Sequence, residues 1–234
     1  MLNFTFGGKN SYDDFNIRIS KRPSIPSPKR RITYVDIPER NSSLKFDEGT
    51  FEDITILVEC SINDRENLLD KIDEIKAWLI NAEESDLIFS FQPDKRYIGQ
   101  VVNSIDFKQV FKFTSSFPIV FNCRPFKYST EDEVITITQI GSIIYNEGTF
   151  KSEPIIKIFG SGDITISINN EEIIIKNVEE YVTIDSVLKD CYKDEVLKNA
   201  DMVGDFPILE IGDNVISFSG NVNKVEVQVN EVWI

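Results

Sequence analysis

Histidine is absent from all 234 residues, and this absence removes several chemistries at once. Without an imidazole there is no Ser-His-Asp or Cys-His nucleophile system, no imidazole base and no His-ligated zinc site. The GxGxxG and P-loop motifs of nucleotide sites and the GxSxG element of hydrolases are missing as well. The absence of these residues and motifs argues against an enzymatic function.

Cysteine is scarce. Cys60, Cys123 and Cys191 are odd in number, lie far apart and form no CxxC motif. Such a pattern is typical of small buried side chains in a reducing compartment, so we expect neither a disulfide nor a metal site.

The sequence shows neither a signal peptide nor a membrane span. Residues 1–9 lack a basic stretch followed by an apolar one, and no uninterrupted apolar run approaches the length of a bilayer. We therefore expect a protein that is made in the cytoplasm, without membrane insertion, and is released only by lysis.

Acidic side chains outnumber basic ones, and this excess is concentrated in one half of the chain. The chain has a formal net charge of −14, which argues against nucleic acid as the main partner. Residues 1–130 hold 18 basic and 19 acidic side chains, whereas residues 131–234 hold 7 and 20. The polar segment 129–133 is typical of a boundary, so we expect two domains, 1–130 and 131–234.

Phenylalanine and β-branched residues are abundant, which favours β-sheet. In the N-terminal half, alternating apolar residues predict strands that contain Phe4, Phe6, Ile17 and Ile19. Further strands are expected at 51–60, 87–91, 97–107 and 111–122. One helix is expected over 63–80, with Asn63 as its cap and Glu66 as the capping-box partner.

Residues 20–50 differ from their surroundings. The segment 20–31 combines three prolines with five basic residues and cannot pair as a central strand. Extended segments follow at 32–38 and 44–46, joined by a turn at 39–43. We expect a projecting arm or long hairpin that contacts a neighbouring subunit, and the interface residues predicted for it are Arg22, Lys29, Arg30, Arg31 and Tyr34.

The C-terminal half consists almost entirely of short strand patterns without crossover helices, which predicts a β-sandwich. The eight expected strands are 134–138, 155–159, 164–168, 173–176, 181–184, 208–211, 215–218 and 225–232. Turns are expected at 160–163, 169–170, 212–214 and 220–221. Segment 187–198 fits either an amphipathic helix or a hairpin.

No group of residues in this half predicts a catalytic or metal site. The pairs Glu171-Glu172, Glu179-Glu180 and Asp194-Glu195 are adjacent, so on a strand their carboxylates point to opposite faces and cannot act on one bond. The 160–163 stretch favours a tight turn over a calcium site. Most of the aromatic residues favour core packing over a sugar-stacking platform; they are Tyr145, Phe150, Tyr181, Tyr192, Phe206 and Trp233.

The order of these features resembles the distal tail protein (Dit) family of long-tailed bacteriophages and prophages over nearly the full length. In the N-terminal half the resemblance is carried by Phe4-Thr5-Phe6-Gly7-Gly8, Arg22-Pro23, Ile37-Pro38-Glu39-Arg40-Asn41, Leu44-Lys45-Phe46, Phe51-Glu52-Asp53-Ile54, the single helix and Phe121-Asn122-Cys123-Arg124-Pro125-Phe126. In the C-terminal half it is carried by Asn146-Glu147-Gly148-Thr149, the segments 153–160 and 183–186, and Gly212-Asp213-Asn214-Val215-Ile216.

The resemblance implies a mainly β fold with one α-helix. It implies an N-terminal, ring-forming, β-barrel-like domain with a projecting hairpin arm and a C-terminal galectin-like β-sandwich. It also implies a non-enzymatic, cofactor-free hub at the virion tail tip, a homo-hexameric ring that joins the tail tube protein to the tail-associated (hub or tail-fibre) protein of the adsorption apparatus. The C-terminal domain would anchor a receptor-binding protein. The alternative is a carbohydrate-binding β-sandwich that aids attachment to the host surface.

Overall fold

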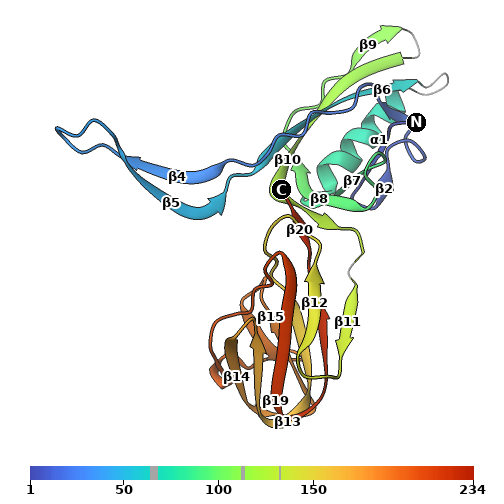
Figure 1. Ribbon diagram of the computed structural model, residues 1–234. Helices are drawn as coiled ribbons and strands as arrows, with labels where there is room; N and C mark the ends of the chain where they lie inside the picture. Colours follow the sequence, from blue (N-terminus) through green and yellow to red (C-terminus); the bar gives the residue numbers. More distant parts are fainter. Residues whose placement is uncertain (64–67, 112–113, 132) are drawn as a thin grey trace. The chain divides into compact units, whose positions relative to one another are not determined.

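The structure is a computed structural model that describes residues 1–63, 68–111, 114–131 and 133–234 (Figure 1). The chain divides into two compact units: unit 1 comprises Met1–Thr130 with Ile234, and unit 2 comprises Glu131–Trp233. Both units are built mainly from antiparallel strands, and the described residues contain a single α-helix. The predicted fold class, mainly β with one helix, is confirmed.

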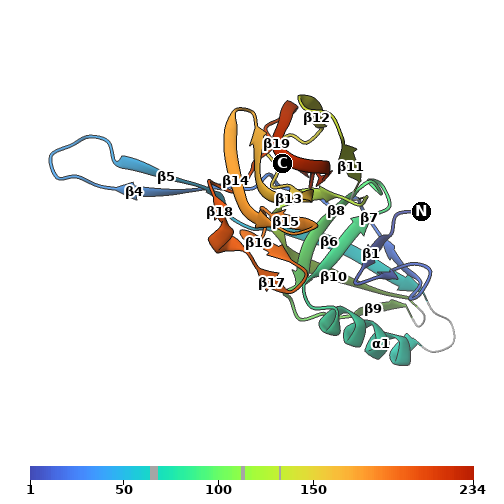
Figure 2. The same cartoon turned by 90° about the horizontal axis from the view of Figure 1, so that it is seen from below.

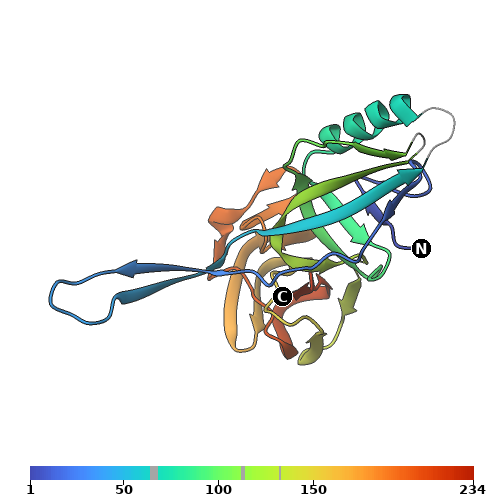
Figure 3. The ribbon, with the colours of Figure 1, turned by 90° about the horizontal axis from the view of Figure 1, so that it is seen from above.

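Unit 1 is organised around an antiparallel sheet with the strand order β2-β1-β7-β8-β10-β6-β3, in which β9 also pairs with β10. Figure 3 shows this sheet curling into a half-barrel. Its strands are β1 (Phe4–Phe6), β2 (Lys9–Asn10), β3 (Ile17–Ile19), β6 (Ile54–Asn63), β7 (Ser85–Phe89), β8 (Lys95–Val101), β9 (Lys108–Phe111) and β10 (Thr114–Ser129).

The core of unit 1 follows from the alternation in the sequence. Every second residue of β6, from Ile54 to Ile62, is buried, because side chains alternate between the two faces of a strand. The helix α1 (Leu68–Asn81) adds Ile75, Trp78 and Leu79 to the same core. The indole of Trp78 stacks on the ring of Phe15, with ring centroids 4.3 Å apart.

The residue that was expected to cap the helix belongs to a strand. Asn63, expected as its cap, is the last residue of β6, and its carbonyl oxygen accepts a hydrogen bond from Asn16 Nδ2 at 2.7 Å. Asn63 therefore takes part in strand pairing and does not cap the helix. The expected capping-box partner Glu66 lies outside the described residues.

Two strand boundaries also differ from the prediction. Strand β8 ends at Val101 rather than at 107, because the side chain of Asn103 takes over the pairing with β10: its Oδ1 accepts from Val120 N–H at 2.8 Å and its Nδ2 donates to Pro118 O at 3.1 Å. The expected strand 111–122 is two strands, since β9 ends at Phe111 and β10 begins at Thr114 and continues to Ser129.

Unit 2 has two long strands, β13 (Ile155–Ile168) and β19 (Gly212–Gln228), that pair with each other over most of their length. The first part of β13 also pairs with β15 (Tyr181–Asp185), and its second part pairs with β14 (Glu171–Val178). Isoleucines from both parts, among them Ile156, Ile158, Ile164 and Ile166, belong to one buried core.

The other elements of unit 2 are short. They are β11 (Val134–Ile137), β12 (Ser142–Asn146), β16 (Asp190–Lys193), β17 (Val196–Leu197), the 3-10 turn η1 (Asn199–Asp201), β18 (Met202–Val203) and β20 (Val232–Trp233). Figures 1 and 2 show the strands wrapped around the core.

The expected turns at 160–163 and 220–221 are wrong, because both lie inside continuous strands. The register of β13 against β19 shifts at these points, which lets a strand bend and pass from one layer to the other. Gly160 is required there, since a Cβ on it would lie 2.2 Å from Asn221 O. The expected strand at 208–211 is likewise reduced to an isolated bridge between Leu209 and Ser152.

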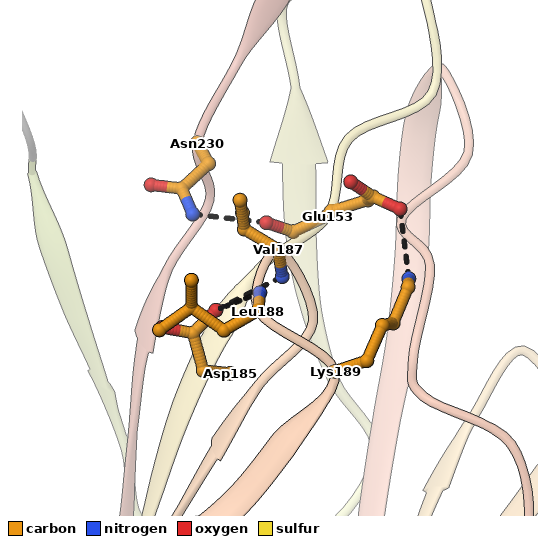
Figure 4. Close-up of polar contacts among 6 residues, drawn as sticks. All are labelled: Glu153, Asp185, Val187, Leu188, Lys189 and Asn230. Atoms are coloured by element: carbon orange, nitrogen blue, oxygen red, sulfur yellow. Dashed lines mark hydrogen bonds and ion pairs between the residues drawn. The ribbon is translucent and has the colours of Figure 1, made fainter. Parts of the chain in front are cut away.

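Segment 187–198 forms a hairpin of β16 and β17, and not a helix. The loop before it is fixed by polar contacts (Figure 4). The carboxylate Oδ1 of Asp185 accepts hydrogen bonds from the backbone N–H groups of Val187 and Leu188, each at 2.9 Å, and Lys189 pairs with Glu153 at 2.8 Å. Asp185 thereby fixes the turn that leads into β16, and the pairing of β16 with β15 and β17 then makes this segment a hairpin.

Candidate functional site: the arm and its exposed apolar face

The arm of unit 1 is a hairpin of β4 (Arg30–Val35) and β5 (Leu44–Phe51). The two strands form a sheet of their own, which joins neither of the two larger sheets. Figures 1 and 3 draw the hairpin standing clear of the half-barrel of unit 1. A two-stranded ribbon is at best marginally stable in water, so this hairpin is the kind of element that a partner surface stabilises.

One face of the arm is apolar and exposed. The register pairs Val35 with Leu44 and Thr33 with Phe46, and these two pairs lie on the same face because side chains alternate along each strand. The exposed fractions of Val35, Leu44 and Phe46 are 48%, 49% and 64%. We call these three residues the apolar arm face.

The predicted interface residues lie along the arm and at its base. The guanidinium of Arg22 lies 4.2 Å from the ring centroid of Phe91, a residue of the half-barrel. Tyr34 is exposed and faces Lys45 across the ribbon, with the lysine Nζ 5.9 Å from its ring centroid. Arg31 is exposed beside the irregularity in the β4–β5 register.

The two remaining predicted residues are ion-paired within unit 1. Lys29 Nζ lies 3.2 Å from Glu52 Oε1, and Arg30 Nη1 lies 3.1 Å from Asp47 Oδ2. Residues 29–52 contain five basic and five acidic side chains, so this part of the arm has no net charge. The basic residues therefore need no acidic partner for charge balance.

Sequence reasoning missed the apolar arm face. The alternation of Leu44 and Phe46 did predict a strand, but a pattern with period two does not tell which side of a strand is covered. The structure shows that the ribbon pairs with neither large sheet. The side chains of Val35, Leu44 and Phe46 are therefore exposed in the described part of the chain.

A cavity of about 440 Å³ lies beside α1 in unit 1, lined among others by Lys9, Phe15, Glu74 and Trp78. Its aromatic rings stack on each other, and Trp78 Nε1 donates to Phe6 O at 3.0 Å. The rings of Phe15 and Trp78 and the indole N–H of Trp78 already have partners within the protein. The cavity therefore offers a ligand fewer free groups than the arm offers to a partner protein.

The described ranges contain neither a candidate membrane span nor a candidate metal site. No helix there is long and apolar enough to cross a membrane. No group of three or more cysteine, aspartate or glutamate residues is placed to hold a metal ion.

Residues 9–123, which include the arm, match the family model of the phage tail protein RIFT-related domain. This part of unit 1 is therefore similar to a phage tail domain. This match spans the arm, the helix and most of the half-barrel, so the arm belongs to the tail domain itself.

The fold of the whole chain is similar to that of the Dit protein of phage SPP1, whose crystal structure is described as a paradigm of the hub adsorption apparatus in phages that infect Gram-positive bacteria. The two are 12% identical, the match covers 100% of both chains, and the TM-score is 0.76. At that identity the likeness concerns the fold. The structure of the phage p2 baseplate in its activated conformation with Sr also matches, with 10% identity, coverage of 97% and 98%, and a TM-score of 0.47.

No curated protein matches the sequence. The family match and the shared fold confirm the resemblance to distal tail proteins. Both comparisons lead to structural proteins of phage tails rather than to enzymes. They support a structural role in a virion tail.

Proposed function

We propose that this chain is the distal tail hub of a long-tailed phage or prophage, in which six copies close into a ring through their tail domains. The ring joins the tail tube protein to the tail-associated protein of the adsorption apparatus. Unit 2 offers a further attachment site for a receptor-binding protein. The protein is made in the cytoplasm of the bacterial host and functions at the tail tip.

The observation that carries this proposal is the exposed apolar arm face. Burying apolar surface is favourable by roughly 25 cal/mol per Å², and a ribbon that carries Val35, Leu44 and Phe46 on one side gains most by lying on a neighbour. A heterologous contact of this kind, repeated around an axis, closes into a ring. The arm thus extends the interface between adjacent subunits.

The test is the mass of the purified chain by light scattering, together with negative-stain microscopy. We expect rings for the parent chain and a shift to smaller species for the double variant Leu44→Ser/Phe46→Ser. The control is Leu188→Ser, which removes an exposed leucine from unit 2. If the double variant assembles as well as the parent chain and the control variant do, the apolar arm face does not contribute to ring assembly. A parent chain that stays monomeric at high concentration contradicts the ring.

Attachment to host-surface carbohydrate is the second candidate function. It is favoured by a polar and aromatic cavity on one sheet face of unit 2, lined among others by Lys157, Tyr181 and Tyr192.

A further inference from the structure

One sheet face of unit 2 carries polar and aromatic side chains in a regular arrangement. The register of β11, β19, β13, β15 and β16 aligns Thr136, Glu226, Lys157, Thr183 and Tyr192 in one row across the sheet. On β13, β15 and β19 the residues on either side of this row, such as Ile156 and Ile158 on β13, are buried in the core. Neighbouring strands lie about 4.8 Å apart, so the row extends roughly 14 Å from Glu226 to Tyr192.

This row forms the middle of a cavity of about 370 Å³, which we call the cleft. Its lining residues are Val134, Ile155, Lys157, Tyr181, Thr183, Tyr192, Asp194, Glu226 and Gln228. Every one of them belongs to unit 2. The lining joins aromatic rings with hydrogen-bond donors and acceptors, which is the composition of a site for a polar ligand.

One basic residue, Lys157, lines the cleft, and two more lysines lie over neighbouring aromatic rings although unit 2 is strongly acidic. Of its seven lysines, three lie over aromatic rings of this face: Lys157 Nζ is 4.1 Å and Lys193 Nζ 5.4 Å from the ring centroid of Tyr181, and Lys224 Nζ is 4.3 Å from that of Phe159. The ring of Tyr192 has no such cation above it among the described residues. Tyr192 is half-buried and lines the cleft, so its ring is placed to take part in stacking with a ligand.

Within the described ranges, Lys157 and Thr183 of the cleft take part in no ion pair or side-chain hydrogen bond, although Lys157 lies over the ring of Tyr181. Lys224 is paired with Glu226 at 2.5 Å and Lys193 with Glu180 at 3.0 Å, but no ion pair engages Lys157. Thr183 is only 7% exposed, and its hydroxyl makes no hydrogen bond to another described residue. Because Thr183 lines the cleft, its hydroxyl is placed to exchange a hydrogen bond with a ligand there.

The charge of the lining is balanced. Glu226 is neutralised by Lys224, and the positive charge of Lys157 is matched by the negative charge of Asp194, which accepts a hydrogen bond from the hydroxyl of Tyr181. An anionic ligand would also meet the acidic field of the whole unit, with 20 acidic against 7 basic side chains. The lining therefore fits an uncharged ligand rich in hydroxyl groups.

We propose that the cleft binds a neutral oligosaccharide. One sugar ring stacks on Tyr192, while Lys157 and Thr183 hydrogen-bond to hydroxyl groups and Glu226 accepts from them. This inference rests on the second candidate function and gives it a site and a ligand class. It needs no ring, because all of the residues lie in unit 2.

The test uses the full chain on an array of neutral and acidic oligosaccharides, followed by calorimetric titration with the neutral oligosaccharide that gives the strongest signal. We expect Tyr192→Ala and Lys157→Met each to weaken binding about tenfold, and Thr183→Val to weaken it less. The matched control is Tyr145→Ala, which removes a tyrosine of unit 2 that is 58% exposed and lies on β12, outside the cleft.

Three results would overturn the proposal. They are the absence of binding to any neutral oligosaccharide at millimolar concentration, a preference for acidic over neutral sugars, and equal weakening by Tyr145→Ala and Tyr192→Ala. Circular dichroism of each variant separates lost binding from lost folding. Light scattering on the same samples measures ring assembly. A loss of sugar binding and a loss of ring assembly can therefore be distinguished.

Discussion

Arg30 and Asp47 face each other across the arm, with Nη1 of the arginine 3.1 Å from Oδ2 of the aspartate. The pKa of Asp47 lies below its ordinary value, first because the backbone N–H of Gly49 donates to its carboxylate and then because of Arg30. The positive charge of Arg30 is therefore paired with Asp47 within the β4–β5 ribbon. Under the proposed function the arm can contact a neighbouring subunit through its charges or through the apolar arm face, and these two contributions can be measured separately.

Charge reversal separates the two explanations. We expect Arg22→Glu, Lys29→Glu, Arg30→Glu and Arg31→Glu together to reduce ring formation in low salt, because the carboxylates introduced at positions 29 and 30 would then repel those of Glu52 and Asp47. Exposed pairs contribute only about 0.2–1 kcal/mol each, so several changes are needed, and added salt should reduce the difference. The measurement is the oligomer fraction by light scattering at low and high ionic strength.

The control is the swap Arg30→Asp/Asp47→Arg, which keeps the pair and reverses its direction. If Arg30 acts only within the ribbon, the swap assembles like the parent. If Arg30 meets an acidic neighbour, the swap assembles as poorly as Arg30→Asp alone. A quadruple variant that stays as oligomeric as the parent in dilute low-salt buffer would show that these charges do not contribute to assembly.

High pH should destabilise the protein through buried acids. Burial raises the pKa of Tyr97 to about 12, and burial followed by the charge of Asp53 raises that of the Cys123 thiol to about 12. Burial also raises the pKa of Cys60. In the unfolded chain these groups lose their protons at lower pH, so their contribution to stability is complete only below about pH 8 and is lost as pH rises toward 12.

The variant Tyr97→Phe isolates one of these groups. The hydroxyl of Tyr97 is buried and makes no hydrogen bond within the described part of the protein, so its removal should leave stability at pH 7 equal or higher. Above pH 10 the variant should lose less stability than the parent, by a difference on the order of 2 kcal/mol. Urea unfolding followed by circular dichroism at pH 7, 9 and 11 measures both effects. An equal loss in parent and variant would mean that Tyr97 does not remain protonated in the folded state.

The sequence predicted best what local periodicity determines. Strand β6 was expected because its apolar residues alternate, and α1 because Ile72, Ile75 and Leu79 recur at helical spacing. The bends of β13 and β19 were read as hairpin turns, since glycine and asparagine mark turns and bulges alike. What distinguishes the two is a distant strand, for Gly160 lies against the backbone of Asn221.

The candidate sites show the same division. Tyr181 and Tyr192 stand out in the sequence as aromatic residues, but their alignment with Lys157 and Thr183 arises from pairing across three strands. In the arm, the basic residues were conspicuous by composition, whereas the exposure of Phe46 depends on where the rest of the chain lies. Local patterns do not contain that information.

The bends of unit 2 give a stability prediction. A Cβ on Gly160 would lie 2.2 Å from Asn221 O, and one on Gly220 would lie 2.6 Å from Asp163 O. We therefore expect Gly160→Ala and Gly220→Ala each to destabilise the protein by about 1–3 kcal/mol, because backbone must move to make room. Urea unfolding midpoints provide the measurement.

Gly162 supplies the control at the same bend. Its φ is positive at 79°, but a Cβ there would meet nothing within 4 Å. The cost of Gly162→Ala should thus be limited to the left-handed backbone, about 1 kcal/mol. A larger loss from Gly162→Ala than from Gly160→Ala would contradict the close approach of the two strands as the reason for glycine.

Separation of the chain after Thr130 tests the division into units. Each unit has its own buried core, one built around Trp78 and Phe121 and the other around the isoleucines of β13. Both pieces are also long enough to bury such a core. We therefore expect residues 1–130 and residues 131–234 to fold separately, each with a cooperative thermal transition by circular dichroism.

The two pieces should differ in assembly. Residues 1–130 carry the arm and are nearly neutral, with 18 basic and 19 acidic side chains, so self-association meets little repulsion. Residues 131–234 have 7 basic against 20 acidic side chains and repel one another, which favours a soluble monomer. Light scattering should find rings or smaller oligomers for the first piece and a monomer for the second. An oligomeric second piece beside a monomeric first would reverse the roles of the units, and two unfolded pieces would mean that neither core is sufficient alone.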